Sequence, residues 1–166
     1  MTVEIDIAVE CESWAELEDL DGLVRAAIDA ALTESGVDLR TEPEVSLLFC
    51  DDARIRELNR QWRSIDKPTN VLSFPAADPS QLRTTPLLGD IAVAYETVRR
   101  ESLDEGKAFR DHVSHMVVHG FLHLVGYDHQ KEEEALQMED LERRSLARLG
   151  IADPYAATVP VGGEQR

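Results

Sequence analysis

Three histidines late in the chain have the residue type and the spacing of metal ligands. His119 and His123 are four residues apart, so they share one face of a helix, and His129 follows after a glycine, Gly126. Glycine adopts the left-handed conformation that ends helices, which lets the chain fold back and bring His129 to the same point. Proteins hold catalytic zinc with three neutral imidazoles and a fourth position left open. The spacing therefore predicts one zinc ion per chain, bound by these three histidines.

The spacing equals that of the long zinc-protease motif H-E-x-x-H-x-x-G-x-x-H, except that Gly120 replaces the general-base Glu. A single histidine on an apolar helix is more often a hydrogen-bonded core residue than a ligand. A whole stripe of ionisable rings on a buried helix, however, is costly unless the rings are used. Four of the five histidines form such a stripe: His112, His115, His119 and His123. We expect His115 to support the ligands or to pack beside them, and His112 to lie on the surface near the helix start.

Alternating apolar patterns predict the elements that position these residues. We expect strands at 2–9, 45–50, 71–74 and 89–95, a loop at 76–88, a helix from about Leu17 that is closed by Gly36, a helix capped by Asp51 or Asp52 that runs to about Ser64, and helices at 96–104, 107–125 and 131–149. This order indicates an α+β fold with a small mixed four-stranded sheet packed with about five helices. The prediction is a single domain over residues 1–155, followed by a flexible C-terminal tail over 156–166.

The helix after the second strand carries the other chemically suggestive residues. Its apolar stripe, which we expect to be buried, consists of Ile55, Leu58 and Trp62. The opposite side carries three arginines, Arg56, Arg60 and Arg63. A solvated basic face is an equally good reading of Arg56 and Arg60. Arg63 differs because the turn that follows it starts a strand that can bring the helix end near the metal. Since arginine holds phosphate through two parallel hydrogen bonds, this arrangement suits a phosphodiester substrate better than a peptide.

The composition narrows the classes of partner. Seventeen basic and thirty-three acidic residues give a net charge of −16, which is the wrong sign for indiscriminate binding of nucleic acid. The N-terminus lacks the basic start of a signal peptide, no apolar run reaches membrane-spanning length, and the two cysteines, Cys11 and Cys50, form no disulfide framework. We therefore expect a cytoplasmic protein that binds neither membranes nor DNA.

Four separated motifs in the stretch from about residue 45 to 155 resemble the YbeY family of bacterial rRNA maturation factors, which are also described as metal-dependent endoribonucleases. The motifs are LNRQWR at 58–63, DKPTNVLSFP at 66–75, LGDI at 88–91 and HMVVHGFLHLVGYDH at 115–129. The resemblance maps the family's histidine triad onto His119, His123 and His129, and its functional arginine onto Arg63. It also matches positions expected to line or support the cleft, namely Asp66, Thr69, Ser73 and Asp90.

The resemblance implies a zinc-dependent endoribonuclease that is specific for single strands. The expected roles are maturation of the 3′ end of 16S ribosomal RNA and ribosome quality control. The expected partners are single-stranded ribosomal RNA, the small ribosomal subunit and ribosome-associated proteins. His119, His123, His129 and Arg63 would carry the reaction, with Arg63 stabilising charge on the nonbridging phosphate oxygens. The attacking group stays open between water and the 2′-hydroxyl of the RNA, and no general base is assigned.

Two other classes of function fit parts of the pattern. A metallopeptidase-like hydrolase is favoured by the motif spacing and opposed by Gly120. A non-catalytic ribosome-assembly factor with a structural zinc would need a fourth protein ligand, for which Asp128 and His115 are the candidates. An open fourth position would count against this second alternative.

Overall fold

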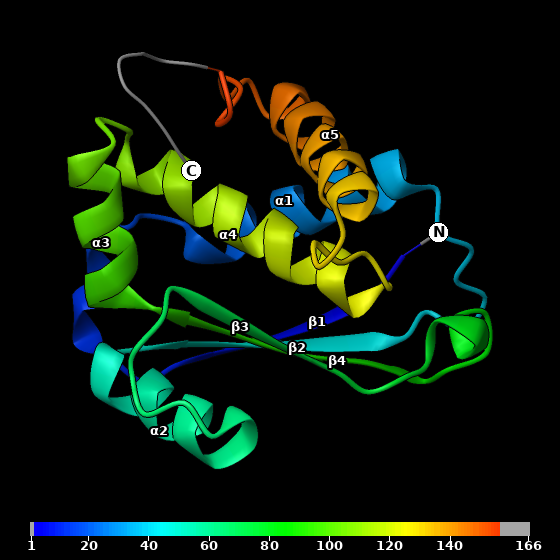
Figure 1. Ribbon diagram of the computed structural model, residues 1–166, viewed down its shortest axis with the longest axis horizontal. Coiled ribbons are helices and arrows are strands. Elements are labelled where there is room, and N and C mark those ends of the chain that lie inside the picture. Colours follow the sequence, from blue (N-terminus) through cyan, green and yellow to red (C-terminus); the bar gives the residue numbers. More distant parts are fainter. Residues whose placement is uncertain (1, 157–166) are drawn as a thin grey trace.

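The computed structural model describes residues 2–156 and contains a twisted four-stranded sheet with helices on both faces (Figure 1). The strands are β1 (Glu4–Val9), β2 (Glu44–Cys50), β3 (Val71–Pro75) and β4 (Leu87–Ala94), in the spatial order β1-β2-β4-β3. β1, β2 and β4 are parallel, whereas β3 pairs antiparallel with β4. The predicted mixed four-stranded sheet is confirmed.

Five α-helices lie within the described residues: α1 (Leu20–Ser35), α2 (Asp52–Arg63), α3 (Tyr95–Asp104), α4 (Phe109–Leu124) and α5 (Glu132–Arg148). Short 3-10 turns at Glu12–Glu16 and Pro79–Gln81 add to them, the second within the segment predicted as a loop. Helix α4 crosses one face of the sheet and packs against α1 and α5, while α2 lies on the other face (Figure 1). The predicted α+β class and the five helices are confirmed.

The ends of α2 follow from the residues that flank it. The Asp51 side chain accepts a hydrogen bond from the backbone N–H of Arg54, which satisfies one of the unpaired donors at the helix start. Ser64 ends the helix in the left-handed conformation, and its N–H donates to the carbonyl of Arg60. These caps fix where Arg63 leaves the helix, directly before the turn into β3.

The predicted apolar stripe of α2 is wrong at its end. Ile55 is fully buried and Leu58 is half-buried, but Trp62 is 65 % exposed. Asn59 is buried instead, and its side-chain amide donates to the carbonyl of Lys67 at 2.9 Å. The last turn of α2 is therefore covered by the turn into β3 rather than by the sheet, so a polar residue replaces the expected apolar contact. Trp62 lies at the rim against Phe74, with ring centroids 6.5 Å apart.

The structure bears on two further expectations, the C-terminal tail and the absence of a membrane-spanning segment. The predicted tail lies outside the described residues except for residue 156, so the domain boundary at 155 stays a prediction. Within residues 2–156, none of the helices combines the length and the apolar character needed to cross a membrane.

Candidate metal centre

Helix α4 is buried on almost all sides, which explains its nearly continuous apolar sequence. Its apolar residues pack between the sheet and helices α1 and α5, and most of them are fully buried. The helix ends at Leu124, and Gly126 adopts a φ of +101°, in the left-handed region that favours glycine. The backbone N–H of Tyr127 donates to the carbonyl of Leu122 at 3.0 Å and closes this turn. The predicted reversal at Gly126 is therefore confirmed.

The reversal brings the three predicted histidines together. One ligand nitrogen each from His119, His123 and His129 lies within 4.8 Å of the other two. Their ring centroids are 4.8 Å apart for 119 and 123, 5.6 Å for 119 and 129, and 5.0 Å for 123 and 129. His119 and His123 are half-buried and His129 is exposed, so the cluster opens to solvent on one side. A borderline ion such as Zn²⁺ prefers this set of donors, and the residues present therefore fit a metal.

Electrostatics favour the neutral, ligating form of the central ring. Burial, followed by repulsion from His119 and His129, lowers the pKa of His123 to about 4. A metal needs the unprotonated nitrogen, so this imidazole is ready to bind at neutral pH without first losing a proton.

Behind the cluster lies a carboxylate that the sequence analysis missed. Glu142 of α5 is 1 % exposed, and its Oε2 lies 2.7 Å from Nδ1 of His119. Burial opposes ionisation, but the hydrogen bonds with His115 and His119 outweigh it and keep the pKa of Glu142 well below its usual range. The signal that could have found this residue is its place on the face of α5 that carries Met138, Leu141 and Ser145, which is buried and where a charge is rare unless it is paired.

His115 occupies the supporting position that was predicted for it. It is buried, and its Nε2 lies 2.6 Å from Oε1 of Glu142. The hydroxyl of Tyr155 donates to the same carboxylate oxygen. Burial lowers the pKa of His115, although Glu142 acts in the opposite direction. His115 therefore contacts the carboxylate that holds His119 and is not itself part of the three-histidine cluster within residues 2–156.

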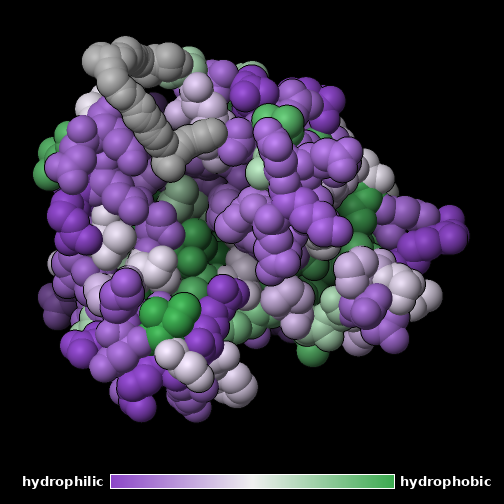
Figure 2. All heavy atoms as spheres, viewed as in Figure 1, coloured by the Kyte–Doolittle hydropathy of each residue, from purple (hydrophilic) through white to green (hydrophobic). Residues whose placement is uncertain are grey.

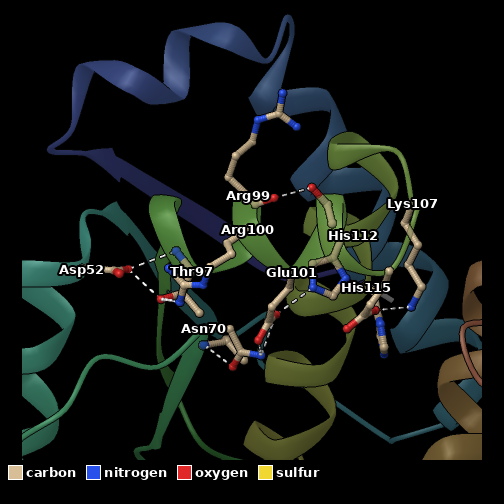
Figure 3. Close-up of polar contacts among 12 residues, drawn as sticks. Asp52, Asn70, Thr97, Arg99, Arg100, Glu101, Lys107, His112 and His115 are labelled. Atoms are coloured by element: carbon tan, nitrogen blue, oxygen red, sulfur yellow. Dashed lines mark hydrogen bonds and ion pairs between the residues drawn. The ribbon is translucent and has the colours of Figure 1, made fainter. Parts of the chain in front are cut away.

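The predicted surface position of His112 is wrong. Its ring is 4 % exposed, and Nε2 lies 2.8 Å from Oε1 of Glu101 in α3 (Figure 3). Glu101 also accepts two hydrogen bonds from the side-chain amide of Asn70, at 3.1 and 3.2 Å. The hydrogen bonds with His112 and Asn70 overcome the effect of burial and keep the pKa of Glu101 below its usual value. The start of α4 is buried because α3 packs against it, which helix periodicity alone does not reveal.

Arg63 is linked to the histidine helix through one strand residue. Its Nη2 donates to the carbonyl of Ser73 at 3.1 Å, and its guanidinium lies 6.0 Å from the ring centroid of Phe74. The Ser73 hydroxyl in turn donates to the carbonyl of Gly120 at 3.0 Å, between two of the clustered histidines. Arg63 is exposed, so part of its guanidinium faces solvent. Arg63 and helix α4 thus contact the same strand residue, Ser73, and the approach of the guanidinium to the metal centre stays a prediction.

Gly120 faces the sheet and not the cluster. A side-chain Cβ at this position would lie 2.9 Å from Cγ2 of Ile91 and 3.2 Å from Oγ of Ser73. Glycine is therefore needed for the close packing of α4 on β3 and β4. A Glu in its place would first have to displace buried neighbours.

The other residues matched by the family motifs are dispersed. Asp66 pairs with Arg56 at 2.8 Å on the exposed surface, which fits the reading of Arg56 as part of a solvated basic face. Asp90 points to the opposite face of the sheet from α4, because neighbouring strand residues alternate between faces. There it lines a groove of about 380 Å³ together with Asp6, Leu58, Trp62 and Phe74.

Comparison with known proteins points to one family. The sequence profile of the family described as endoribonuclease YbeY matches residues 6–150. A protein named endoribonuclease YbeY from Methylocella silvestris is 56 % identical over 151 residues, which cover 91 % of this chain and 85 % of that protein. Another protein of this name, from Beijerinckia indica subsp. indica, is 58 % identical over 169 residues, covering 96 % and 82 %. The solution structure of a Thermotoga maritima protein has the same fold, with a TM-score of 0.56 and 24 % identity over 94 % of this chain and 97 % of that one.

Proposed function

The chain belongs to the endoribonuclease YbeY family, and from this premise we propose that it is a zinc-dependent endoribonuclease. Its substrate would be single-stranded ribosomal RNA, in maturation of the 3′ end of 16S rRNA and in ribosome quality control. The observation that carries the proposal is the half-open cluster of His119, His123 and His129. We further propose that the protein acts in the cytoplasm, on the small ribosomal subunit and together with ribosome-associated proteins.

In the proposed reaction, the histidines bind the metal and Arg63 stabilises charge on the phosphate. When bound, zinc supplies a Lewis acid that polarises a phosphoryl oxygen or a water molecule. The three imidazoles would hold the ion and leave one side of the site open to the substrate. Arg63 presents N–H groups that match two oxygens of a phosphate and stabilise the charge that develops on them. Its bond to Ser73 fixes the guanidinium relative to β3 and thereby to the histidine helix.

The surface charge shapes substrate selection. Hydrophilic side chains cover most of the face seen in Figure 2, and the whole chain carries −16. General attraction to RNA is therefore weak, and binding falls steeply with salt. Since Arg56 is paired with Asp66, Arg60 and Arg63 remain as the basic side chains at the exposed end of α2. Selectivity then comes from this local patch, or from delivery of the RNA by a protein at the ribosome.

Both alternative functions lose support. The tight packing around Gly120 leaves no space for the general base of a metallopeptidase. The cluster within residues 2–156 includes neither Asp128 nor His115: Asp128 accepts a hydrogen bond from the N–H of His129, and His115 is engaged by Glu142. A fully closed structural zinc site is thus not favoured.

The proposal is tested by measuring zinc content and cleavage of a single-stranded 3′ fragment of 16S rRNA in parallel. We expect one zinc per native chain, loss of both zinc and cleavage in His119→Ala, and retained zinc with roughly 100-fold slower cleavage in Arg63→Ala. Arg25→Ala, which removes an exposed arginine of α1, is the matched control and should cleave like the native chain. Unchanged cleavage in both site variants would mean a contaminating nuclease, and the assembly-factor alternative would then lead.

A further inference from the structure

Glu142 is a buried carboxylate whose place in the molecule needs a reason. It lies on α5 and is 1 % exposed, yet both of its oxygens contact histidines of α4. A buried charge is costly, and replacing such a group by an apolar residue is often neutral or stabilising for a fold. Its presence therefore indicates a task other than holding α5 against α4.

The contacts of Glu142 divide between its two oxygens. Oε2 lies 2.7 Å from Nδ1 of His119, while Oε1 lies 2.6 Å from Nε2 of His115 and accepts the hydroxyl of Tyr155. Two residues, His115 and Tyr155, thus restrain the carboxylate independently of its contact with His119. A group fixed in this way can set the orientation of the ring that it contacts.

The chemistry of the contact fixes the tautomer of His119. The carboxylate oxygen Oε2 accepts in this contact, since Oε1 is engaged by His115 and Tyr155, so Nδ1 of His119 carries the hydrogen. In the neutral ring, the lone pair then lies on Nε2, which is the nitrogen left for the three-histidine cluster. Negative charge on the far side of the ring also increases the basicity of that nitrogen.

From this geometry we infer that Glu142 is a positioning residue of the metal centre, which fixes the tautomer and the orientation of His119 and sets the affinity of the site for metal. This role rests on the proposed metal-dependent function. His115 and Tyr155 act through Glu142 by restraining its carboxylate.

A second histidine–carboxylate pair of helix α4, formed with Glu101 of α3, provides a matched control. Glu101 is also an ionised, partly buried carboxylate that contacts a histidine of α4, at 2.8 Å, but its partner His112 is outside the cluster. Glu101→Gln therefore reproduces the chemical change of Glu142→Gln without touching a proposed ligand. Both amides keep the volume of the side chain and remove its charge.

The experiment measures the zinc dissociation constant of each folded variant by competition with a chromophoric chelator. The visible absorption spectrum of the Co²⁺ form reports on the ligand field. We expect Glu142→Gln to weaken zinc binding by about 10- to 100-fold and to change the Co²⁺ spectrum. Glu101→Gln should stay within about twofold of the native affinity even if it unfolds more easily. His119→Ala gives the reference for a lost ligand.

Each outcome has a distinct meaning. Native affinity and an unchanged Co²⁺ spectrum in Glu142→Gln would overturn the positioning role while leaving the proposed function intact. Equal losses in Glu142→Gln and Glu101→Gln would also overturn it, because general destabilisation would then explain both. If Glu142→Gln does not fold, the metal affinity of Tyr155→Phe relative to Asn70→Ala decides: a weaker site only in the first supports the role, and equal affinities oppose it. Failure of the native chain to bind zinc would overturn both proposals.

Discussion

Two histidines of helix α4 each pair with a carboxylate of another helix. In the first pair the histidine is the more buried member, and in the second it is the carboxylate. At the start of the helix the ring of His112 is inside, at 4 % side-chain exposure, and its partner Glu101 reaches outward at 31 %. At the other end the carboxylate of Glu142 is inside, at 1 %, and the ring of His119 is 23 % exposed. The exposed member is what a ligand can reach: a carboxylate at the first end, an imidazole at the second.

The free ring nitrogens show the same contrast. In both pairs the carboxylate engages one nitrogen and leaves the other as an acceptor. For His112 that nitrogen, Nδ1, is buried without a hydrogen-bond partner among residues 2–156. For His119 it belongs to the cluster with His123 and His129. Histidine–carboxylate pairs that differ in the ring nitrogen engaged, Nε2 in His112 and Nδ1 in His119, thus give an anchor at one end of the helix and a candidate metal centre at the other.

The largest expected effect separates the two ends directly. His123→Ala removes a cluster nitrogen and should weaken zinc binding by more than about 100-fold, beyond the range seen for outer partners of ligands. His112→Ala should leave the zinc affinity unchanged but lower the free energy of unfolding by about 2–4 kcal/mol, through a cavity and a lost charged hydrogen bond. Chelator competition and urea unfolding measure the two quantities. Loss of zinc affinity in His112→Ala would break the comparison.

The position of the cluster end depends on close packing at Gly120. Gly120→Ala should lower the free energy of unfolding by about 1–3 kcal/mol, because the new methyl group meets Ile91 and Ser73 and outweighs the better helix propensity of alanine. Urea unfolding of the metal-free protein checks this expectation. A variant as stable as the native chain would mean that α4 can shift away from the sheet at little cost.

The response to pH sharpens the contrast, because burial lowers the pKa of both His115 and His123. The unfolded chain binds protons at these rings near pH 6.5 and the folded chain does not, so the stability of the metal-free protein falls as pH decreases below about 6.5. After allowance for its partial exposure, His123 contributes about 1 kcal/mol between pH 7 and 5. Urea unfolding at these two values measures the change, and His123→Asn should show a weaker dependence on pH. Equal stability at both values would contradict the lowered pKa values.

The smallest effect belongs to the anchor. Asn70→Ala removes the amide that donates to Glu101, as well as the side-chain oxygen that accepts from the N–H of Val71. We expect a loss of about 1 kcal/mol in unfolding free energy and an unchanged zinc dissociation constant. A weakened metal site in this variant would show that the two ends of α4 are coupled.

Much of this arrangement could be predicted from sequence, since local chemistry determines it. The four strands, the five helices, the cap at Asp51 and the reversal at Gly126 depend on periodicity and on the conformational freedom of single residues. The gathering of His119, His123 and His129 follows from the same local geometry.

The features that sequence did not predict depend on contacts between segments that are distant along the chain. Trp62 is exposed because the turn before β3 and not the sheet covers the end of α2. His112 is buried by α3, and Glu142 meets His119 across twenty-three residues of sequence. Such contacts depend on how helices pack, which the hydrophobic pattern of one helix does not specify.

Removal and return of the metal tests the central claim most directly. The purified chain is stripped with a chelator and assayed on one single-stranded rRNA 3′ fragment, free or annealed to its complement, before and after addition of one equivalent of zinc. We expect no cleavage by the stripped protein, restored cleavage of the free strand at one zinc per chain, and little cleavage of the duplex. Full activity of the stripped protein, or no activity with the site fully loaded, would contradict the central claim.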